Sequence, residues 1–137
     1  MAKITYEKIV LLLSSLLILL CLFFYPSEEH SLGKSFTYFE NPSFISYWNR
    51  KDTLQFEIPP VVQSYTNTKN YILAQQHPNK NDDYLFPHYD YPYGRDSTYY
   101  WFIDKQTKEL TGPLLYSEME LFLKDRGFLY LLMNLSQ

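Results

Sequence analysis

Cysteine and glycine are scarce in this chain, and their scarcity excludes several kinds of protein. Cys21 is the only cysteine, so no disulfide within the chain can stabilise the fold. With only four glycines, the chain has neither a glycine-rich phosphate loop nor the Gly-x-Ser-x-Gly turn of a serine hydrolase. Phosphate binding by a glycine-rich loop is therefore excluded, and we do not expect a serine hydrolase.

An excess of positive charge is also missing. The chain has 12 Lys plus Arg against 15 Asp plus Glu, a formal net charge of -3. Proteins that bind nucleic acid or anionic lipid usually have a basic stripe or patch, and no such stripe is visible here. We therefore expect no nucleic-acid partner.

The most informative feature that is present is the apolar N-terminal run at residues 9–25, which contains no charged residue. As a helix, the stretch from Ile4 to Tyr25 would be roughly 33 Å long, enough to cross the hydrocarbon layer of a bilayer. Lys3 and Lys8 precede the run, and acidic residues follow it. This asymmetry predicts a membrane anchor at residues 1–25, with its N-terminus in the cytoplasm and residues 26–137 outside as one domain.

Two alternatives to an uncleaved anchor stay open. A cleaved secretory signal would also begin with a short basic stretch and an apolar run, but Phe23, Phe24 and Tyr25 are too bulky for a typical cleavage site. A bacterial lipoprotein would carry its lipid on Cys21, although Leu20 stands where a small residue is expected. An uncleaved single-pass protein is the reading that the sequence favours.

Downstream of the anchor, the sequence predicts mainly β structure. Aromatic residues make up 19% of the chain, with 14 Tyr and 10 Phe, and such residues suit the half-buried faces of sheets. Strand-like segments are Ser35–Tyr38, Phe44–Trp48, Leu54–Ile58, Val61–Tyr65, Tyr71–Ala74 and Tyr99–Ile103. The last two are continuous apolar runs, which predicts central strands covered on both faces. We expect an α+β fold in which an antiparallel meander of about five or six strands precedes a C-terminal helix.

The C-terminal helix has recognisable start and stop signals. A polar turn at Asp104–Glu109 and a break at Gly112-Pro113 precede it. Ser117 and Glu120 have the spacing of a capping box, and Gly127 suits the left-handed residue after the last turn. We expect Met119, Phe122 and Leu123 to face the sheet, and the apolar segment 128–135 to complete the core.

A long loop from His77 to Ser97 carries the candidate functional residues. Its aromatic residues are Tyr84, Phe86, Tyr89, Tyr91 and Tyr93. Because rigid rings with polar tips recur in binding loops, these side chains are our candidate binding site for a partner protein or glycan. The alternative is that the loop folds back over a sheet edge and buries its rings.

The same loop contains side chains of types that bind metals, namely His77, Asp82, Asp83, His88 and Asp90. Their spacing matches neither a zinc site nor the alternating oxygen ligands of a calcium loop. We therefore expect no metal, no cofactor and no catalytic residues.

The second half of the chain has a pattern that is similar to a group of small bacterial proteins. Ile103-Asp104-Lys105 is followed by Gly112-Pro113-Leu114 and by the acidic helix start Ser117-Glu118. In this it resembles small uncharacterised bacterial membrane-anchored or lipoprotein-like envelope proteins. The resemblance implies a small α+β envelope domain and brings no catalytic residue with it.

Together these features predict a non-catalytic interaction module that faces the periplasm or the exterior. The bilayer itself is the first expected partner, through residues 9–25, and another envelope protein or a glycan is the second. An accessory or immunity-type subunit of a larger membrane complex is the alternative. A metal-dependent envelope hydrolase is a further alternative that rests only on the histidines and acids of the loop.

Overall fold

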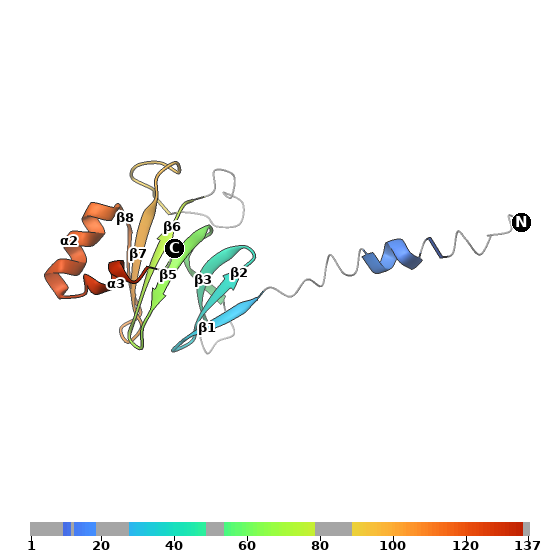
Figure 1. Cartoon of the computed structure of the whole chain (residues 1–137), viewed down its shortest axis with the longest axis horizontal. Coiled ribbons are helices and arrows are strands. Elements are labelled where there is room, and N and C mark those ends of the chain that lie inside the picture. Colours follow the sequence, from blue (N-terminus) through green and yellow to red (C-terminus); the bar gives the residue numbers. More distant parts are fainter. Residues whose placement is uncertain (1–9, 12, 19–27, 49–53, 79–88, 136–137) are drawn as a thin grey trace, which may run out of the picture.

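A computed structural model describes residues 10, 11, 13–18, 28–48, 54–78 and 89–135 of the chain. Two four-stranded antiparallel sheets and two C-terminal helices form the folded part (Figure 1). The first sheet contains β1 (Glu29–Gly33), β2 (Phe36–Glu40), β3 (Ser43–Trp48) and β4 (Leu54–Ile58), in that order. The second contains β5 (Val62–Asn67), β6 (Tyr71–Gln76), β7 (Tyr99–Asp104) and β8 (Glu109–Leu114).

The strands form two meanders, whereas the sequence led us to expect one meander of five or six strands. The chain leaves the first sheet at Pro59 and Pro60, between β4 and β5. Proline has no N–H to donate to a neighbouring strand, so strand pairing is interrupted here. The prediction that one strand ends at these prolines and another begins after them is confirmed, but its consequence for the number of sheets was missed.

Two strands have weak sequence signals and were not predicted. β1 reads Glu-His-Ser-Leu-Gly, and only Leu32 among these residues is buried. β8 contains Gly112-Pro113, which we expected to break the chain. An edge strand tolerates a proline because one side of its backbone has no neighbour, and β8 is such an edge.

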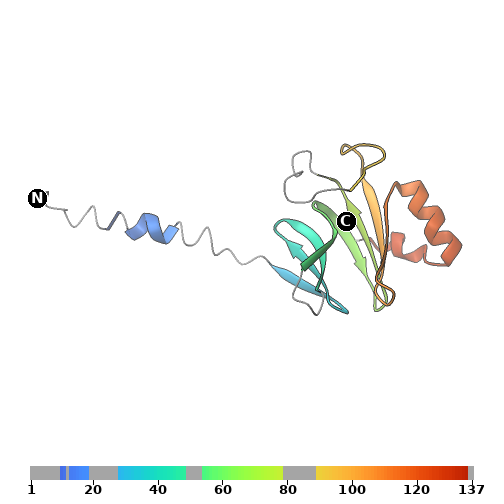
Figure 2. The same ribbon diagram turned by 180° about the vertical axis from the view of Figure 1, so that it is seen from behind.

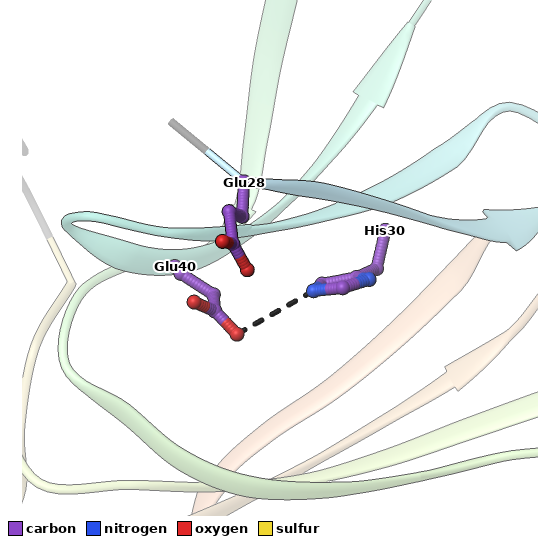
Figure 3. A group of neighbouring side chains, drawn as sticks. All are labelled: Glu28, His30 and Glu40. Carbon is purple, nitrogen blue, oxygen red and sulfur yellow. Dashed lines mark ion pairs between the residues drawn. The ribbon is translucent and has the colours of Figure 1, made fainter. Parts of the chain in front are cut away.

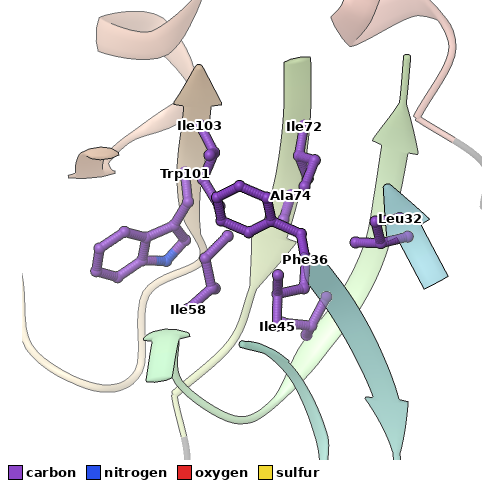
Figure 4. Close-up of a cluster of buried hydrophobic side chains, with 9 residues drawn as sticks. Leu32, Phe36, Ile45, Ile58, Ile72, Ala74, Trp101 and Ile103 are labelled. Carbon is purple, nitrogen blue, oxygen red and sulfur yellow. The ribbon is translucent and has the colours of Figure 1, made fainter. Parts of the chain in front are cut away.

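The main core lies between the two sheets. Side chains from β1 to β4 meet side chains from β5 to β7 there (Figure 4). The buried members are Leu32, Phe36, Ile45, Ile58, Val62, Ile72, Ala74, Trp101 and Ile103. The two sheets therefore pack face to face, and each supplies one half of this core.

Two helices cover the opposite face of the second sheet (Figure 2), and a second core lies between them and the sheet. Helices α2 (Tyr116–Arg126) and α3 (Tyr130–Met133) place Met119, Leu123 and Leu131 against Leu73 and Phe102 of the sheet. β6 and β7 are thus buried on both faces at the centre of their sheet. This confirms the prediction that their apolar runs are central strands, and that α2 faces the sheet through Met119, Phe122 and Leu123.

The ends of α2 differ in how well the sequence predicted them. The capping box assigned to Ser117 and Glu120 is wrong, because the helix begins at Tyr116 with Leu115 as its N-cap. Instead, Glu118 accepts the N–H of Leu115 through Oε2 at 2.7 Å. The C-terminal end is as predicted: Gly127 has φ 74°, and the N–H of Phe128 donates to the carbonyl of Leu123 at 2.8 Å.

Within the predicted anchor, residues 10, 11 and 13–18 are helical, and the rest of it lies outside the described residues. Ser14 Oγ donates to the carbonyl of Leu11 at 2.9 Å, so this hydroxyl is bonded within its own helix. No helix among the described residues combines the length and the apolar character needed to span a bilayer.

Candidate functional site

At one end of the sandwich, hairpin turns from both sheets come together (Figure 1). An open groove of about 640 Å³ lies between residues of these turns. We call it the turn-end groove. It is lined by Ser31, Leu32, Gly33, Lys34, Asn67, Thr68, Lys69 and Lys105. These residues come from the β1–β2 hairpin, from the β5–β6 turn and from the position just after β7. The volume falls within the range of small-molecule binding sites, about 300–1,000 Å³.

Lys105 is the most unusual residue of the turn-end groove, because it is only 3% exposed. Its ammonium donates to the carbonyl of Leu32, to Asn67 Oδ1 at 2.5 Å and to the carbonyl of Thr68 at 2.6 Å. An ammonium has three hydrogens, so all of them are used. Lys105 thereby joins β1 of the first sheet to β5 of the second.

The backbone around Lys105 is fixed by the turns beside it. The Lys105 N–H donates to the carbonyl of Asn70 at 2.8 Å, which continues the pairing of β7 with β6 by one residue. Asp104 then starts the next turn, since its Oδ1 accepts the N–H of Gln106 at 2.8 Å and that of Thr107 at 3.3 Å. These bonds keep the lysine stem directed toward the first sheet.

In the part of the chain that the structure describes, the charge of Lys105 is not balanced by an acid. Its three acceptors are neutral oxygens, and no carboxylate among the described residues forms an ion pair with it. Burial lowers the pKa of Lys105, and the nearby positive charge of Lys34 lowers it further. Both causes indicate that the surroundings of this ammonium do not supply enough negative charge to compensate it.

The walls of the turn-end groove carry two more lysines. Lys34 and Lys69 are exposed, and Lys34 Nζ donates to Asn70 Oδ1 at 3.5 Å. Lys34 follows Gly33, whose φ of 85° is a left-handed conformation that favours glycine. A Cβ at residue 33 would lie 3.9 Å from the ammonium of Lys105, so the glycine also keeps a side chain from that ammonium.

A second cluster of charged side chains lies at the other end of the β1–β2 hairpin. Glu28, His30 and Glu40 each offer an atom that could bind a metal, all within 4.8 Å of one another (Figure 3). His30 Nε2 is 3.4 Å from Glu40 Oε1, and the N–H of Glu40 donates to the carbonyl of Glu28 at 3.1 Å. All three side chains are exposed. The sequence did not reveal this cluster, because Glu40 is brought to the other two only by strand pairing.

Of the predicted binding tyrosines, Tyr89 and Tyr91 pack against the main core. Tyr89 stands edge-on to the indole of Trp101, with ring centroids 5.0 Å apart, and donates to the carbonyl of Glu57 at 3.1 Å. Tyr91 lies 5.1 Å from the ring of Tyr99 and accepts a hydrogen bond from Gln76 Nε2 at 3.0 Å. Burial is the largest cause that raises the pKa of both tyrosines.

Tyr93 is different, because this residue is 53% exposed. Its hydroxyl donates to Glu118 Oε1 at 3.3 Å, and its backbone N–H donates to the hydroxyl of Tyr99 at 3.0 Å. Tyr84 and Phe86 lie outside the described residues. The β5–β6 turn lies at the start of β6, and the long loop begins at the end of β6. The turn-end groove and the loop tyrosines therefore lie at opposite ends of this strand.

The metal-binding residue types of the loop can be placed only in part. His77 Nδ1 lies 3.4 Å from Thr98 Oγ1, and Asp90 is exposed. Asp82, Asp83 and His88 lie outside the described residues. The described members therefore do not test whether the loop binds a metal.

The turn-end groove was missed at the sequence level, although one of its residues was visible there. Lys105 belongs to the Ile103-Asp104-Lys105 pattern that carries the resemblance to envelope proteins. A lysine directly after an apolar strand is usually exposed, so only the packing of β1 against the β5–β6 turn shows that this one is buried. The partners of Lys105 at residues 32 and 67 are too distant in sequence to be inferred from spacing.

The fold and the groove define a class: a small α+β protein in which a two-sheet sandwich carries helices on one outer face and an open groove at one end. The family model described as "Protein of unknown function (DUF3997)" matches residues 38–125, more than half of the chain. The chain belongs to this family. The matched region runs from β2 to α2 and includes Asn67, Lys69 and Lys105. Comparison with curated proteins and with solved structures found no match.

Proposed function

We propose that this DUF3997 protein is a membrane-tethered, non-catalytic binding domain outside the cytoplasm, and that it holds its partner at the turn-end groove. The observation that carries the proposal is the groove itself, an open hollow of about 640 Å³ built by turns from both sheets. Binding sites commonly lie on loops and turns that a rigid scaffold positions. Here the scaffold is the packed sandwich, and Lys105 fixes the two sets of turns relative to one another.

A smaller cavity elsewhere is a weaker candidate. It lies where the second sheet meets the end of α2 and is lined by Phe102, Asp104, Glu109, Thr111, Phe122, Arg126 and Phe128. Its volume is about 80 Å³, well below the size of a pocket that encloses a ligand. The guanidinium of Arg126 lies 3.9 Å from the centroid of the Phe122 ring, which is a packing contact.

The chemistry of the groove lining supports a binding role without catalysis. The described lining residues contain lysines, an amide, hydroxyls and apolar or backbone groups, and none of them has a carboxylate, imidazole or thiol. General acid–base catalysis most often uses an imidazole or a carboxylate, and a hydroxyl nucleophile needs such a base beside it. Lys105 is also a poor candidate for a base, since its three hydrogens are all donated to protein oxygens.

Two observations support the membrane tether. The sequence places lysines before an uncharged apolar run and acids after it. In the helical part of that run, the large apolar side chains are 46–68% exposed, with Val10 the least and Leu11 the most exposed. Exposed leucines around a helix are costly in water, and a lipid environment removes that cost.

Site-specific photo-crosslinking tests the proposed binding site. The full chain, produced in its own cells, carries p-benzoylphenylalanine in place of Ser31, an exposed residue of the turn-end groove. The control variant carries it in place of Ser117, an exposed serine in the first turn of α2. We expect a discrete adduct on illumination from residue 31 and none from residue 117. Adducts from both positions, or from neither, would contradict a partner at this groove.

The tether is tested separately by N-terminal sequencing of the mature chain. An uncleaved anchor keeps the residues that precede Ile9, and a cleaved signal loses the whole apolar run. Protease added to cells with a permeabilised outer layer should digest the domain and leave a small membrane fragment. A mature chain that begins after Tyr25 would show that the segment is a cleaved signal.

A further inference from the structure

The turn-end groove has an excess of positive charge that no carboxylate among the described residues neutralises. Three lysines line it, and one of them, Lys105, is buried. Removing an ammonium from water is unfavourable even after relaxation, and neutral carbonyl oxygens recover only part of the lost solvation. A second ammonium close by, that of Lys34, adds repulsion. An anion in the groove would offset both the lost solvation of Lys105 and the repulsion between the two ammonium groups.

We propose that the turn-end groove is a binding site for a phosphate group, held by Lys34, Lys69 and the amide of Asn67 in the field of Lys105. This inference rests on the proposed function, because it names the chemistry of the ligand at the same groove. A phosphate at neutral pH carries between one and two negative charges and several acceptor oxygens. It therefore matches two exposed ammonium groups and a third one beneath them better than a carboxylate does.

The orientation of Asn67 adds a donor to this site. Its Oδ1 accepts from Lys105 at 2.5 Å. An ammonium has no acceptor, so the amide oxygen, not the amino group, must face it. The Nδ2 amino group is then directed away from Lys105 and can donate to an anion in the groove. The hydrogen bond from Lys105 polarises the amide of Asn67, and the amide offers its N–H groups to the groove as donors.

The two sources of a phosphate group, free phosphate and a phosphate monoester, share this chemistry. Calorimetric titration of the full chain in detergent micelles with inorganic phosphate, glycerol 3-phosphate and acetate compares them. We expect both phosphates to bind and acetate to bind at least about tenfold more weakly. Tighter binding of the ester than of inorganic phosphate would identify a monoester as the ligand. Equal binding of acetate would overturn the phosphate assignment.

Charge-matched variants test where the anion binds. Replacing both groove lysines (Lys34→Gln, Lys69→Gln) should weaken phosphate binding at least about tenfold. A control that also loses two positive charges (Lys124→Gln, Arg126→Gln) changes exposed residues near the end of α2, outside the groove lining. It should bind phosphate as the wild type does. An equal loss in both variants would mean that phosphate responds only to net charge, and would overturn the site.

A third variant keeps every lysine. Asn67→Asp places a carboxylate of the same shape beside the Lys105 ammonium and removes the amide donor. We expect phosphate binding to be lost while the chain stays folded, and unchanged binding would refute the role given to Asn67. Crosslinking from residue 31 without phosphate binding would refute the ligand class and leave the proposed function standing. Phosphate binding without any crosslink would refute the proposed function and leave the ligand class standing.

Discussion

The indole of Trp101 donates from Nε1 to Oε1 of Gln76 at 2.7 Å, inside the main core and on neighbouring strands. Gln76 is itself completely buried, and its Nε2 donates to the carbonyl of Pro60 at 2.8 Å and to the hydroxyl of Tyr91 at 3.0 Å. One amide therefore links β7, the connection between the two sheets and the long loop.

Replacing this glutamine with an apolar residue of similar size should destabilise the fold. Gln76→Leu leaves the Trp101 N–H and the Pro60 carbonyl without their partner in a dry environment, and each unpaired buried group costs about 1–3 kcal/mol. We expect the free energy of unfolding, measured by urea denaturation, to fall by about 2–4 kcal/mol. Gln63→Leu is the matched control, because Gln63 is exposed on β5. Equal stability of the two variants would contradict a structural role for Gln76.

The sequence predicted those parts of the fold that are determined by local patterns. Runs such as Tyr99–Ile103 identified the central strands, and Gly127 identified the end of α2. The alternation at Leu54–Ile58 gave β4 with its observed bounds. In each case a periodicity or a single backbone requirement within a few residues is sufficient.

Other parts depend on contacts between distant residues, and the sequence could not supply them. β1 was missed because a short polar edge strand with one inward residue, Leu32, has no clear period. The turn-end groove was missed because Lys105 finds its acceptors at residues 32, 67 and 68. For the same reason the loop tyrosines Tyr89 and Tyr91 could not be assigned to the core or to the surface, since their contacts with Trp101 and Gln76 are made only in the folded chain.

An acidic residue in the main core should prevent folding. Ile103 is 1% exposed and faces the first sheet. Ile103→Asp would bury a carboxylate without a partner, which costs at least about 3 kcal/mol and is a large part of the stability of a small domain. Circular dichroism melting should show no cooperative transition. Leu121→Asp, at a position on α2 that is 62% exposed, should melt as the wild type does. A normal transition in Ile103→Asp would place β7 on the surface.

Gly112 should tolerate no side chain. A Cβ at this position would lie 2.8 Å from Cε3 of Trp101 and 2.9 Å from the carbonyl oxygen of Tyr100, and its φ is 140°. We expect Gly112→Ala to lower the free energy of unfolding by more than about 2 kcal/mol. Gly94→Ala is the control: it has φ 75°, and no described residue beyond its two chain neighbours has an atom within 4 Å of the added carbon. Backbone strain alone should cost it about 1–2 kcal/mol. Urea denaturation should show a lower free energy of unfolding for Gly112→Ala than for Gly94→Ala. A lower value for Gly94→Ala would refute this explanation.

Removal of metal ions should leave the fold unchanged. Glu28, His30 and Glu40 are exposed at the start of the first hairpin, so no buried charge depends on an ion there. An exposed pair such as His30 with Glu40 contributes about 0–1 kcal/mol to stability. We expect EDTA to leave the melting temperature within about 1 °C and the purified chain to contain no stoichiometric zinc or calcium. One equivalent of metal that is lost in His30→Ala would identify this cluster as a metal site instead.

Tyr89 should make the fold sensitive to alkali. Burial is the main cause that raises its pKa above the ordinary value of 10.0, and the charges of Glu57 and Tyr91 raise it further. The folded chain therefore keeps this proton at a pH at which the unfolded chain has lost it. The resulting stabilisation is complete below pH 10 and is lost as the pH rises through the pKa of the folded state. In addition, a phenolate cannot donate to the carbonyl of Glu57, which accepts from the hydroxyl at 3.1 Å.

The measurement is the free energy of unfolding in urea at several pH values between about 8 and 12. The wild type should lose stability above pH 10, and Tyr89→Phe should lose less, because it has no proton to give up at this position. The variant should also be less stable than the wild type near pH 8, where the hydrogen bond to Glu57 is intact. Tyr130→Phe changes an exposed ring on α3 and should follow the wild type. Parallel pH profiles for the wild type and Tyr89→Phe would mean that the Tyr89 hydroxyl is equally accessible to water in the folded and unfolded chain, and would return this ring to the candidate binding surface of the loop.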